Sequence, residues 1–289
     1  MSEATATAVR TEAMPGVKGR NVLVTGGSSG IGQAIAVRFA QYGANVAINY
    51  LREPGEAVDT EDRVHACAHQ VRQEGVRDVL VQGDVSQEED VVRMVGEAIE
   101  RLGGLDVLVN NAGIGTPQSA GSPPDERALA VIDVNLLGPW RVTAAALPAL
   151  RDARGRVINV ASGLAFLALP YGPAYCMAKR GLTAYSDTLR LEHGDALTVT
   201  TVYPGYIRTR IHDESNAMGL GLEGRVPAER VEDAAKTIAR AALGPPVRDI
   251  ATTRSGSVSY FVLRHMPRRL LDKVLRRRLE RLGVTLPAS

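Results

Sequence analysis

Short apolar runs alternate along the chain with longer segments in which apolar residues recur every three or four positions. The short runs are typical of strands buried in a parallel sheet, and the longer segments are typical of amphipathic helices. Strands are expected at residues 20–24, 45–50, 79–82, 105–109, 156–161, 197–202 and 249–252. Helices are expected at residues 33–43, 63–74, 86–102, 125–150, 173–193 and 228–242. Because strands alternate with helices, the pattern predicts an α/β domain with a doubly wound parallel sheet.

Polar motifs follow several of these strands at their carboxyl ends, which is where open parallel sheets bind ligands. The first motif is a glycine-rich loop, Thr25-Gly-Gly-Ser-Ser-Gly-Ile-Gly32, between a strand and a helix. Its glycines permit a tight turn and let a pyrophosphate approach the helix N-terminus. Other motifs stand at residues 84, 110–113, 162 and 204–209. Their shared position predicts one binding site along one edge of the sheet.

A second kind of chemistry is expected around Ser162, Tyr175 and Lys179. Ser162 ends a strand, and Tyr175 and Lys179 lie four residues apart on one face of the next helix. A phenol titrates near pH 10, roughly, so it is a poor acid or base at neutral pH. A cation held beside it favours the phenolate and lowers its pKa. Tyr-x-x-x-Lys alone occurs by chance on many helices, but its position among the other motifs predicts a proton-transfer site.

Composition narrows the classes of function. The formal net charge is +2, which gives no global electrostatic case for nucleic-acid binding. Two cysteines, Cys67 and Cys176, give neither a disulfide framework nor a zinc pattern, and this favours a reducing compartment. No window approaches the roughly 20 apolar residues that span a bilayer, and the first ten residues do not resemble a signal peptide. A cytoplasmic protein is therefore expected.

Three segments are expected. Residues 1–18 form a mobile N-terminal tail, residues 19–258 form one Rossmann-like catalytic and cofactor-binding domain, and residues 259–289 form a basic amphipathic tail. Between residues 260 and 283, eight arginines and lysines stand against two acidic residues, among apolar residues at helical spacing. The favoured interpretation is that the apolar face docks on the enzyme or on another subunit. Weak contact with an anionic membrane surface is the alternative.

With these motifs in order, residues 19–255 resemble the short-chain dehydrogenase/reductase family in its single-domain form. The motifs are the TGxxxGIG loop at 25–32, Asp84, the NNAG sequence at 110–113, Pro204-Gly205 with Thr209, and the tetrad of Asn135, Ser162, Tyr175 and Lys179. The resemblance implies hydride transfer between a nicotinamide and a carbonyl or alcohol carbon. It implies Tyr175 as the acid in reduction and the base in oxidation, and Lys179 as the group that tunes it. It also implies that Ser162 hydrogen-bonds the substrate oxygen and that Asn135 holds a water in a proton relay.

The resemblance also implies a cofactor site, and no metal. Its expected residues are Thr25, Gly26, Ser28, Ser29, Gly30, Ile31, Gly32, Asn49, Tyr50, Arg52, Asp84, Val85, Asn111, Ala112, Gly113, Tyr175, Lys179, Pro204, Gly205, Ile207 and Thr209. No carboxylate follows the second strand before Glu53, and Arg52 is placed to pair with a phosphate, so NADP is favoured over NAD. Arg52 as a solvated loop cation is the alternative interpretation. The family resemblance further implies a homo-oligomer, a dimer or tetramer, through the helices around 125–150 and 175–193.

Apolar residues follow Ser162 and recur in a lid expected at residues 210–227, so the substrate is expected to be an apolar ketone or secondary alcohol. The expected pocket wall comprises Leu164, Ala165, Phe166, Leu167, Leu169, Tyr171, Ile211, Met218, Leu220 and Leu222.

Trp140 is expected in the core or in an interface, and His65 with His69 lacks the third ligand of a zinc site. A cofactor-binding redox sensor and a membrane-surface scaffold are the alternative functions. Both share this fold.

Overall fold

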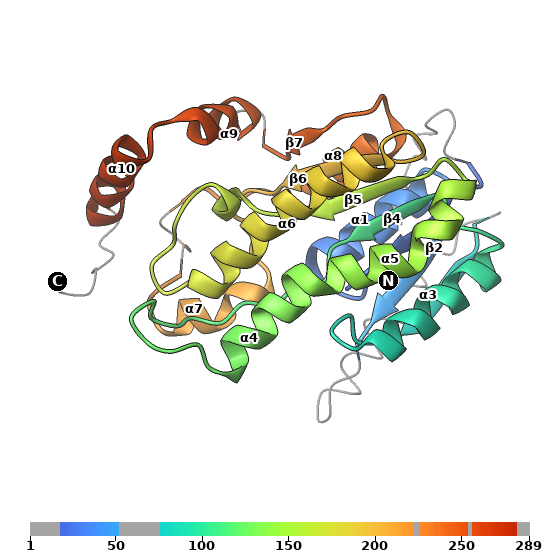
Figure 1. Cartoon of the computed structure of the whole chain (residues 1–289), viewed down its shortest axis with the longest axis horizontal. Helices are drawn as coiled ribbons and strands as arrows, with labels where there is room; N and C mark the ends of the chain where they lie inside the picture. The colour runs from blue at the N-terminus through green and yellow to red at the C-terminus, as the bar shows by residue number, and fades with distance from the viewer. Residues whose placement is uncertain (1–17, 52–75, 222, 224–225, 254–255, 282–289) are drawn as a thin grey trace, which may run out of the picture.

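The computed structural model describes residues 18–51, 76–221, 223, 226–253 and 256–281 (Figure 1). Seven parallel strands form one sheet in the order β3-β2-β1-β4-β5-β6-β7. The strands are β1 Asn21–Val24, β2 Asn45–Tyr50, β3 Asp78–Gln82, β4 Val107–Asn110, β5 Arg156–Val160, β6 Thr198–Tyr203 and β7 Asp249–Ala251. The strand order reverses between β1 and β4, which makes the carboxyl ends of these two strands the switch point where ligands bind. The doubly wound, Rossmann-like fold expected from the sequence is confirmed.

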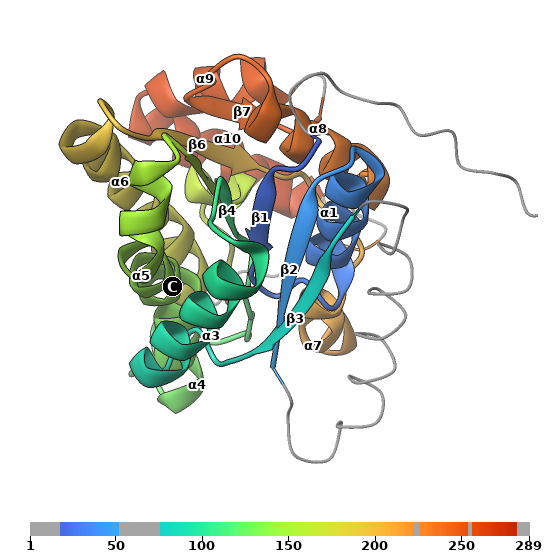
Figure 2. The ribbon, with the colours of Figure 1, turned by 90° about the vertical axis from the view of Figure 1, so that its right-hand side faces the viewer.

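Helices cover both faces of the sheet, as Figure 2 shows along its edge. On one face lie α1 Gly30–Gln41 and α8 Val231–Leu243, and on the other lie α3 Glu88–Leu102, α5 Gly138–Asp152 and α6 Pro173–His193. Side chains alternate along each strand, so β1 sends Val22 and Val24 to the first face and Leu23 to the second. All three are fully buried. Burial on both faces explains why these strands are continuous apolar runs.

The long helix expected at residues 125–150 is interrupted. The chain forms α4 Glu126–Ile132, then a π-helical turn at Asp133–Leu137, and then α5. Pro139 has no N–H to donate to the carbonyl of Asn135 four residues earlier, so regular α-helical pairing cannot continue here. In the π turn the N–H of Gly138 bonds to the Asp133 carbonyl instead. The turn contains Asn135, and such turns concentrate at functional sites.

The remaining elements lie outside the sheet. A 3-10 turn at Gly163–Ala165 follows β5, and the expected lid contains a 3-10 turn at Arg210–His212 and α7 Asp213–Ala217. The C-terminal tail is helical, with α9 Gly256–His265 and α10 Arg268–Arg281. Within the described part of the chain, no helix is both long and apolar enough to cross a bilayer. The helix expected at 63–74, with His65, Cys67 and His69, lies outside the described residues, as does the N-terminal tail up to residue 17.

Candidate active site

The glycine-rich loop is packed so tightly that its glycines cannot carry side chains. Gly26 has φ +59°, and a Cβ there would lie 2.9 Å from the Cα of Ala112. A Cβ on Gly32 would lie 2.1 Å from the carbonyl oxygen of Gly26. Thr25 holds the loop against the next strand, because its Oγ1 accepts hydrogen bonds from the N–H of Asn111 (2.9 Å) and of Ala112 (3.1 Å). The predicted cofactor residues of the first and fourth strands therefore meet.

The loop opens onto the N-terminus of α1, and this terminus suits a diphosphate. Ser29, the N-cap, makes no side-chain capping bond, and the first turn of α1 contains no acidic residue. Backbone N–H groups and the positive end of the helix dipole therefore remain for an anion. Gly30 has φ +53°, and a Cβ there would lie 3.3 Å from the methyl of Thr209, so the segment at 204–209 reaches this loop. These residues fit the pyrophosphate of a dinucleotide cofactor.

Asn49, one of the predicted cofactor residues, lies beneath the loop. Its side chain is buried, its Oδ1 accepts the N–H of Gly26 (3.1 Å), and its Nδ2 donates to the carbonyl of Gly83 (3.0 Å). This side chain holds the loop in place. Tyr50 is half-buried at the end of β2, and Arg52 lies outside the described residues.

Asp84 and Val85 follow β3, as the sequence predicts. The backbone N–H of Asp84 donates to Asp90 (2.9 Å), and its Oδ1 accepts the N–H of Ser86 (2.8 Å). Val85 is buried against Gly138, where a Cβ would come within 2.9 Å of its side chain. These contacts attach the end of β3 to the helical layer of α3 and α5.

The segment at 204–209 is held by a residue that sequence reasoning missed. Glu229 Oε2 accepts hydrogen bonds from the N–H of Gly205 (3.0 Å) and from Thr252 Oγ1 (2.6 Å). Ile207 is buried, so the segment is fixed at this point too. The only signal in the sequence was an acidic residue two positions before a helix, which is typical of many helix starts.

Ser162, Tyr175 and Lys179 come together at the end of β5. The Lys179 Nζ lies 5.7 Å from the centre of the Tyr175 ring and donates to the carbonyl of Val160 (2.9 Å). Ser162 is hydrogen-bonded to Tyr175, and its Oγ also accepts the N–H of Leu164 (3.2 Å). Pro173 begins α6, and the spacing of four residues then stacks Lys179 below Tyr175.

Asn135 joins this group from the π turn. Its fully buried side chain pairs with both backbone groups of Ile114, since Oδ1 accepts the N–H and Nδ2 donates to the carbonyl, each at 2.8 Å. A Cβ on Gly113 would lie 3.0 Å from Asn135 Oδ1 and 3.7 Å from Lys179 Nζ. Gly113 is thus the reason that the lysine and the asparagine can approach the end of β4.

Burial sets the protonation of the two central groups. Burial raises the pKa of Tyr175 to about 12, although the hydrogen bond with Ser162 acts in the opposite direction. Burial also lowers the pKa of Lys179 to about 8. Lys179 is not among the causes of the shift in the Tyr175 pKa, so the expected effect of the lysine on the phenol pKa stays a prediction. Exclusion of water disfavours both charged forms, the phenolate and the ammonium.

A mostly apolar pocket opens beside Tyr175. Leu164, Leu169, Tyr171, Ile211 and Leu220 line it, as predicted, together with Gly115, Thr116, Pro117, Pro170, Gly172, His212, Ser215 and Gly221. Phe166 instead packs on Tyr203, with the ring centres 4.9 Å apart, Met218 is exposed, and Leu222 lies outside the described residues. Sequence reasoning missed the loop at 115–117 and His212. The pocket places apolar surface next to the phenol of Tyr175.

Comparison with known proteins agrees with these motifs. The family model for short chain dehydrogenases matches residues 20–219. The chain belongs to the short-chain dehydrogenase family. It is 34% identical over 197 residues to 11-beta-hydroxysteroid dehydrogenase-like 2 of Arabidopsis thaliana, a match that covers 67% of this chain and 61% of that protein. It is 36% identical over 195 residues to 11-beta-hydroxysteroid dehydrogenase 1A of the same plant, covering 67% and 54%. The chain therefore spans between half and two thirds of the length of these relatives.

Solved structures of similar proteins share the fold. An alcohol dehydrogenase from the archaeon Thermococcus sibiricus, complexed with 5-hydroxy-NADP, is 28% identical with a TM-score of 0.68, covering 80% of this chain and 94% of that one. A dehydrogenase/reductase from Sinorhizobium meliloti 1021 is 31% identical with a TM-score of 0.71, covering 81% and 93%. The resemblance predicted from the motifs is confirmed, and the family to which the chain belongs is one of oxidoreductases that bind a nicotinamide cofactor.

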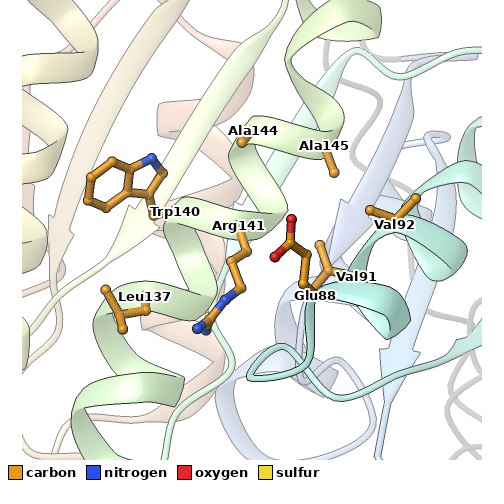
Figure 3. Close-up of a pocket in the computed structure, with 8 residues that line it drawn as sticks. All are labelled: Glu88, Val91, Val92, Leu137, Trp140, Arg141, Ala144 and Ala145. Carbon is orange, nitrogen blue, oxygen red and sulfur yellow. The ribbon is translucent and has the colours of Figure 1, made fainter.

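A second cavity of the protein lies away from the tetrad, between α3 and α5 (Figure 3). It measures about 290 Å³ and is lined by Glu88, Val91, Val92, Leu137, Trp140, Arg141, Ala144 and Ala145. Trp140 is 56% exposed and stacks on Tyr185 with the ring centres 5.5 Å apart. It does not fill the core, so the expected core position is not met, and the expected interface position stays a prediction.

Proposed function

We propose that the protein is an NADP-preferring reductase or dehydrogenase that acts on apolar ketones or secondary alcohols. The observation that carries the proposal is the meeting of Ser162, Tyr175 and Lys179 beside a mostly apolar pocket. A reacting oxygen in that pocket would have a hydroxyl and a phenol as oriented hydrogen-bond donors. Such donors stabilise the alkoxide charge that develops in carbonyl reduction.

Each residue of the tetrad then has a distinct role. When bound, the nicotinamide supplies or accepts the hydride. Tyr175 donates its proton to the carbonyl oxygen in reduction and takes it back in oxidation, while Ser162 holds that oxygen. Lys179 faces the phenol ring and favours its ionised form when the alcohol is oxidised. Asn135 fixes the end of β4 through Ile114, so it acts as a positioning residue.

Preference for NADP is supported by the end of β2. Asn49, Tyr50 and Leu51 offer no carboxylate to the ribose 2′-hydroxyl, so nothing there repels a 2′-phosphate. Arg52 follows in sequence and is the proposed phosphate partner. Titration with NADPH and NADH, followed by fluorescence, tests this point. An Arg52→Ala variant that loses NADPH affinity and keeps NADH affinity supports the proposal, and equal affinities unchanged by the variant contradict it.

The apolar substrate class is supported by the pocket lining, in which leucine, isoleucine, proline and tyrosine dominate. A substrate panel tests it: cyclic and long-chain ketones are expected to be reduced with a higher kcat/KM than sugars of similar size. The control is Tyr175→Phe, which removes the proton donor and must lower kcat for every member by about 10²–10⁴. Preference for polar sugars would overturn the substrate class and leave the reaction class standing.

A homo-oligomer is proposed to form through the outer faces of α5 and α6. Trp140 on α5 and Leu191 on α6 expose apolar side chains, the leucine to 88%, and the cavity of Figure 3 lies beside Trp140. Covering such surface stabilises association. Light scattering tests this, because Trp140→Lys is expected to lower the particle mass towards that of one chain.

We also propose a reducing, cytoplasmic location for the protein, in keeping with the free thiol of Cys176.

A further inference from the structure

The C-terminal tail is not docked along its length on the domain. Figure 1 shows α10 beyond the edge of the body, on the same side as α7 and the yellow-green segment between β5 and α6. Those two segments also wall the pocket beside Tyr175. Of the two expected arrangements, docking of the apolar face on the enzyme's own domain is not seen along α10, and docking on another subunit stays a prediction. The tail therefore lies on the same side of the domain as two segments that wall the pocket.

Part of the apolar face of α10 is open to solvent. Leu270 is 50% exposed and Val274 is 43% exposed, and they are four residues apart on one side of the helix. Leu271 and Leu275, next to them, are half-buried. On α9, Val258 and Val262 repeat the spacing, with exposures of 69% and 48%. Two consecutive helices thus present exposed apolar residues at helical intervals.

Cations lie beside this apolar face. Arg269, Lys273, Arg276 and Arg277 are exposed on α10, against the single described acid Asp272. Residues 260–283 carry eight basic and two acidic residues, so the rest of the chain, by the same count, is net −4. The domain itself would be repelled by an anionic surface, whereas the tail would be attracted. A second copy of the domain would offer the basic tail only a few dispersed negative charges. A layer of lipid phosphates would offer it much stronger electrostatic complementarity.

Ion pairs fix where the tail leaves the domain. Arg264 of α9 lies 3.7 Å from Asp187 of α6 and 3.5 Å from Asp249 of β7. Asp187 also pairs with Arg190 and Arg248, so α9 joins a small charge network. Individually, exposed pairs contribute little, but together they hold α9 in one orientation at the sheet edge. A surface bound by α10 would therefore meet the domain from a defined side.

We infer that α9 and α10 form a docking surface for anionic phospholipid bilayers. Leucine and valine side chains would enter the headgroup boundary while arginine and lysine reach the phosphates. The helices would lie on the surface and would not cross it. The inference goes beyond the proposed reaction and does not depend on it, since it concerns only where the enzyme binds.

Sedimentation with vesicles tests the inference on the full chain. The protein is expected to pellet with vesicles of equal parts phosphatidylglycerol and phosphatidylcholine, and to stay in solution with phosphatidylcholine alone. Arg276→Glu with Arg277→Glu is expected to weaken binding by more than about tenfold. Arg240→Glu, a charge reversal on α8, is the matched control and is expected to bind like the parent. For the apolar face, Leu270→Gln with Val274→Gln is compared with Leu129→Gln, an exposed leucine of α4.

Three outcomes would overturn the inference: no binding to anionic vesicles, equal binding to both kinds of vesicle, or tail variants that bind like the parent. Light scattering without lipid provides a further check. If the tail variants lower the particle mass, the tail covers a second copy instead. Tyr175→Phe keeps the tail intact, so it must bind vesicles normally even if the enzyme has lost its activity, which separates this test from that of the proposed reaction.

Discussion

We call the glycine-rich loop, the ends of β4 and β5 and the start of α6 the floor of the candidate active site. The floor is held by buried hydrogen bonds, whereas the lid at residues 210–227 is held by exposed ion pairs. In the floor, Asn110 Nδ2 donates to Asn159 Oδ1 (2.8 Å) and to Thr143 Oγ1 (2.9 Å), and Asn159 donates to Ser186 (2.8 Å). These side chains are almost completely buried, and they join β4 and β5 to α5 and α6.

The lid at α7 has no such network among the residues that the structure describes. Arg127 of α4 pairs with Glu214, and Thr116 donates to the same carboxylate (3.4 Å). The arginine is 62% exposed and the glutamate 38%. A lost buried hydrogen bond costs about 1–3 kcal/mol, while an exposed pair contributes about 0.2–1 kcal/mol. We therefore expect the floor to hold the reacting groups in place and the lid to adapt to the shape of the substrate.

The largest expected effect comes from removing the reactive group of the floor. Tyr175→Phe keeps the aromatic packing but removes the proton donor, so kcat is expected to fall by about 10²–10⁴. Cofactor affinity should change little, because the ring still covers Lys179. Steady-state kinetics with an apolar ketone, together with cofactor titration, measure both. A variant that keeps the parent's kcat would show that proton transfer does not pass through this phenol.

The next effect tests how tightly the floor is packed. Gly32→Ala places a Cβ 2.1 Å from the Gly26 carbonyl, so the loop must shift. The variant is expected to be destabilised by about 1–3 kcal/mol and to lose cofactor affinity. Gly96→Ala on α3 is the matched control: it has no atom within 4 Å of the new Cβ, and it is expected to gain about 0.5–1 kcal/mol. Thermal unfolding and fluorescence titration distinguish the two, and equal effects would argue against a packed cradle.

The sequence predicts the floor well because its constraints are local. In any α/β fold, a glycine between a strand and a helix predicts a tight turn. A lysine four residues after a tyrosine likewise predicts that the two side chains lie on one face of a helix. The strand order and the meeting of Thr25 with Asn111 follow from this alternation. Every predicted strand is present to within two residues at its ends.

Other features depend on contacts that a linear pattern does not contain. The π turn at Asn135 replaces part of a helix whose apolar periodicity is continuous, and Pro139 was the only local signal. The pKa of Tyr175 depends on the balance between burial and the hydrogen bond with Ser162, which requires the packed structure. Glu229 and His212 reach the site from segments with no recognisable motif. The described part of the lid likewise forms short helices where a run of glycines and polar residues indicated only a loop.

A third prediction concerns the junction between floor and lid, at Pro204-Gly205. Glu229→Ala removes the acceptor for Gly205 N–H and Thr252 Oγ1, and is expected to cost about 1–3 kcal/mol of the free energy of unfolding. Glu229→Gln keeps one oxygen for both donors, and should cost less than the alanine variant. Denaturant unfolding measures the difference. If both variants cost the same, the charge of Glu229 and not its hydrogen bonds holds the segment.

The smallest effect is expected at the lid itself. Arg127 lowers the pKa of Glu214 through a hydrogen bond, so the pair is fully formed above the ordinary carboxyl pKa of 4.5 and is lost as the pH falls through the lowered pKa. Glu214→Gln weakens the link between α7 and α4 at every pH. It is expected to raise KM for a bulky apolar ketone by a few-fold, in line with the small energy of an exposed pair, and to leave kcat unchanged.

Limited proteolysis at α7 provides the pH test. The parent protein should become more susceptible to cleavage at α7 as the pH falls through the lowered pKa of Glu214, while Glu214→Gln should be susceptible throughout. Asp213→Asn, a neighbouring exposed carboxylate on the same helix, is the matched control and should follow the parent. A change in kcat with KM unaffected would place Glu214 in the chemical step. It would then remove the distinction between a floor that reacts and a lid that selects.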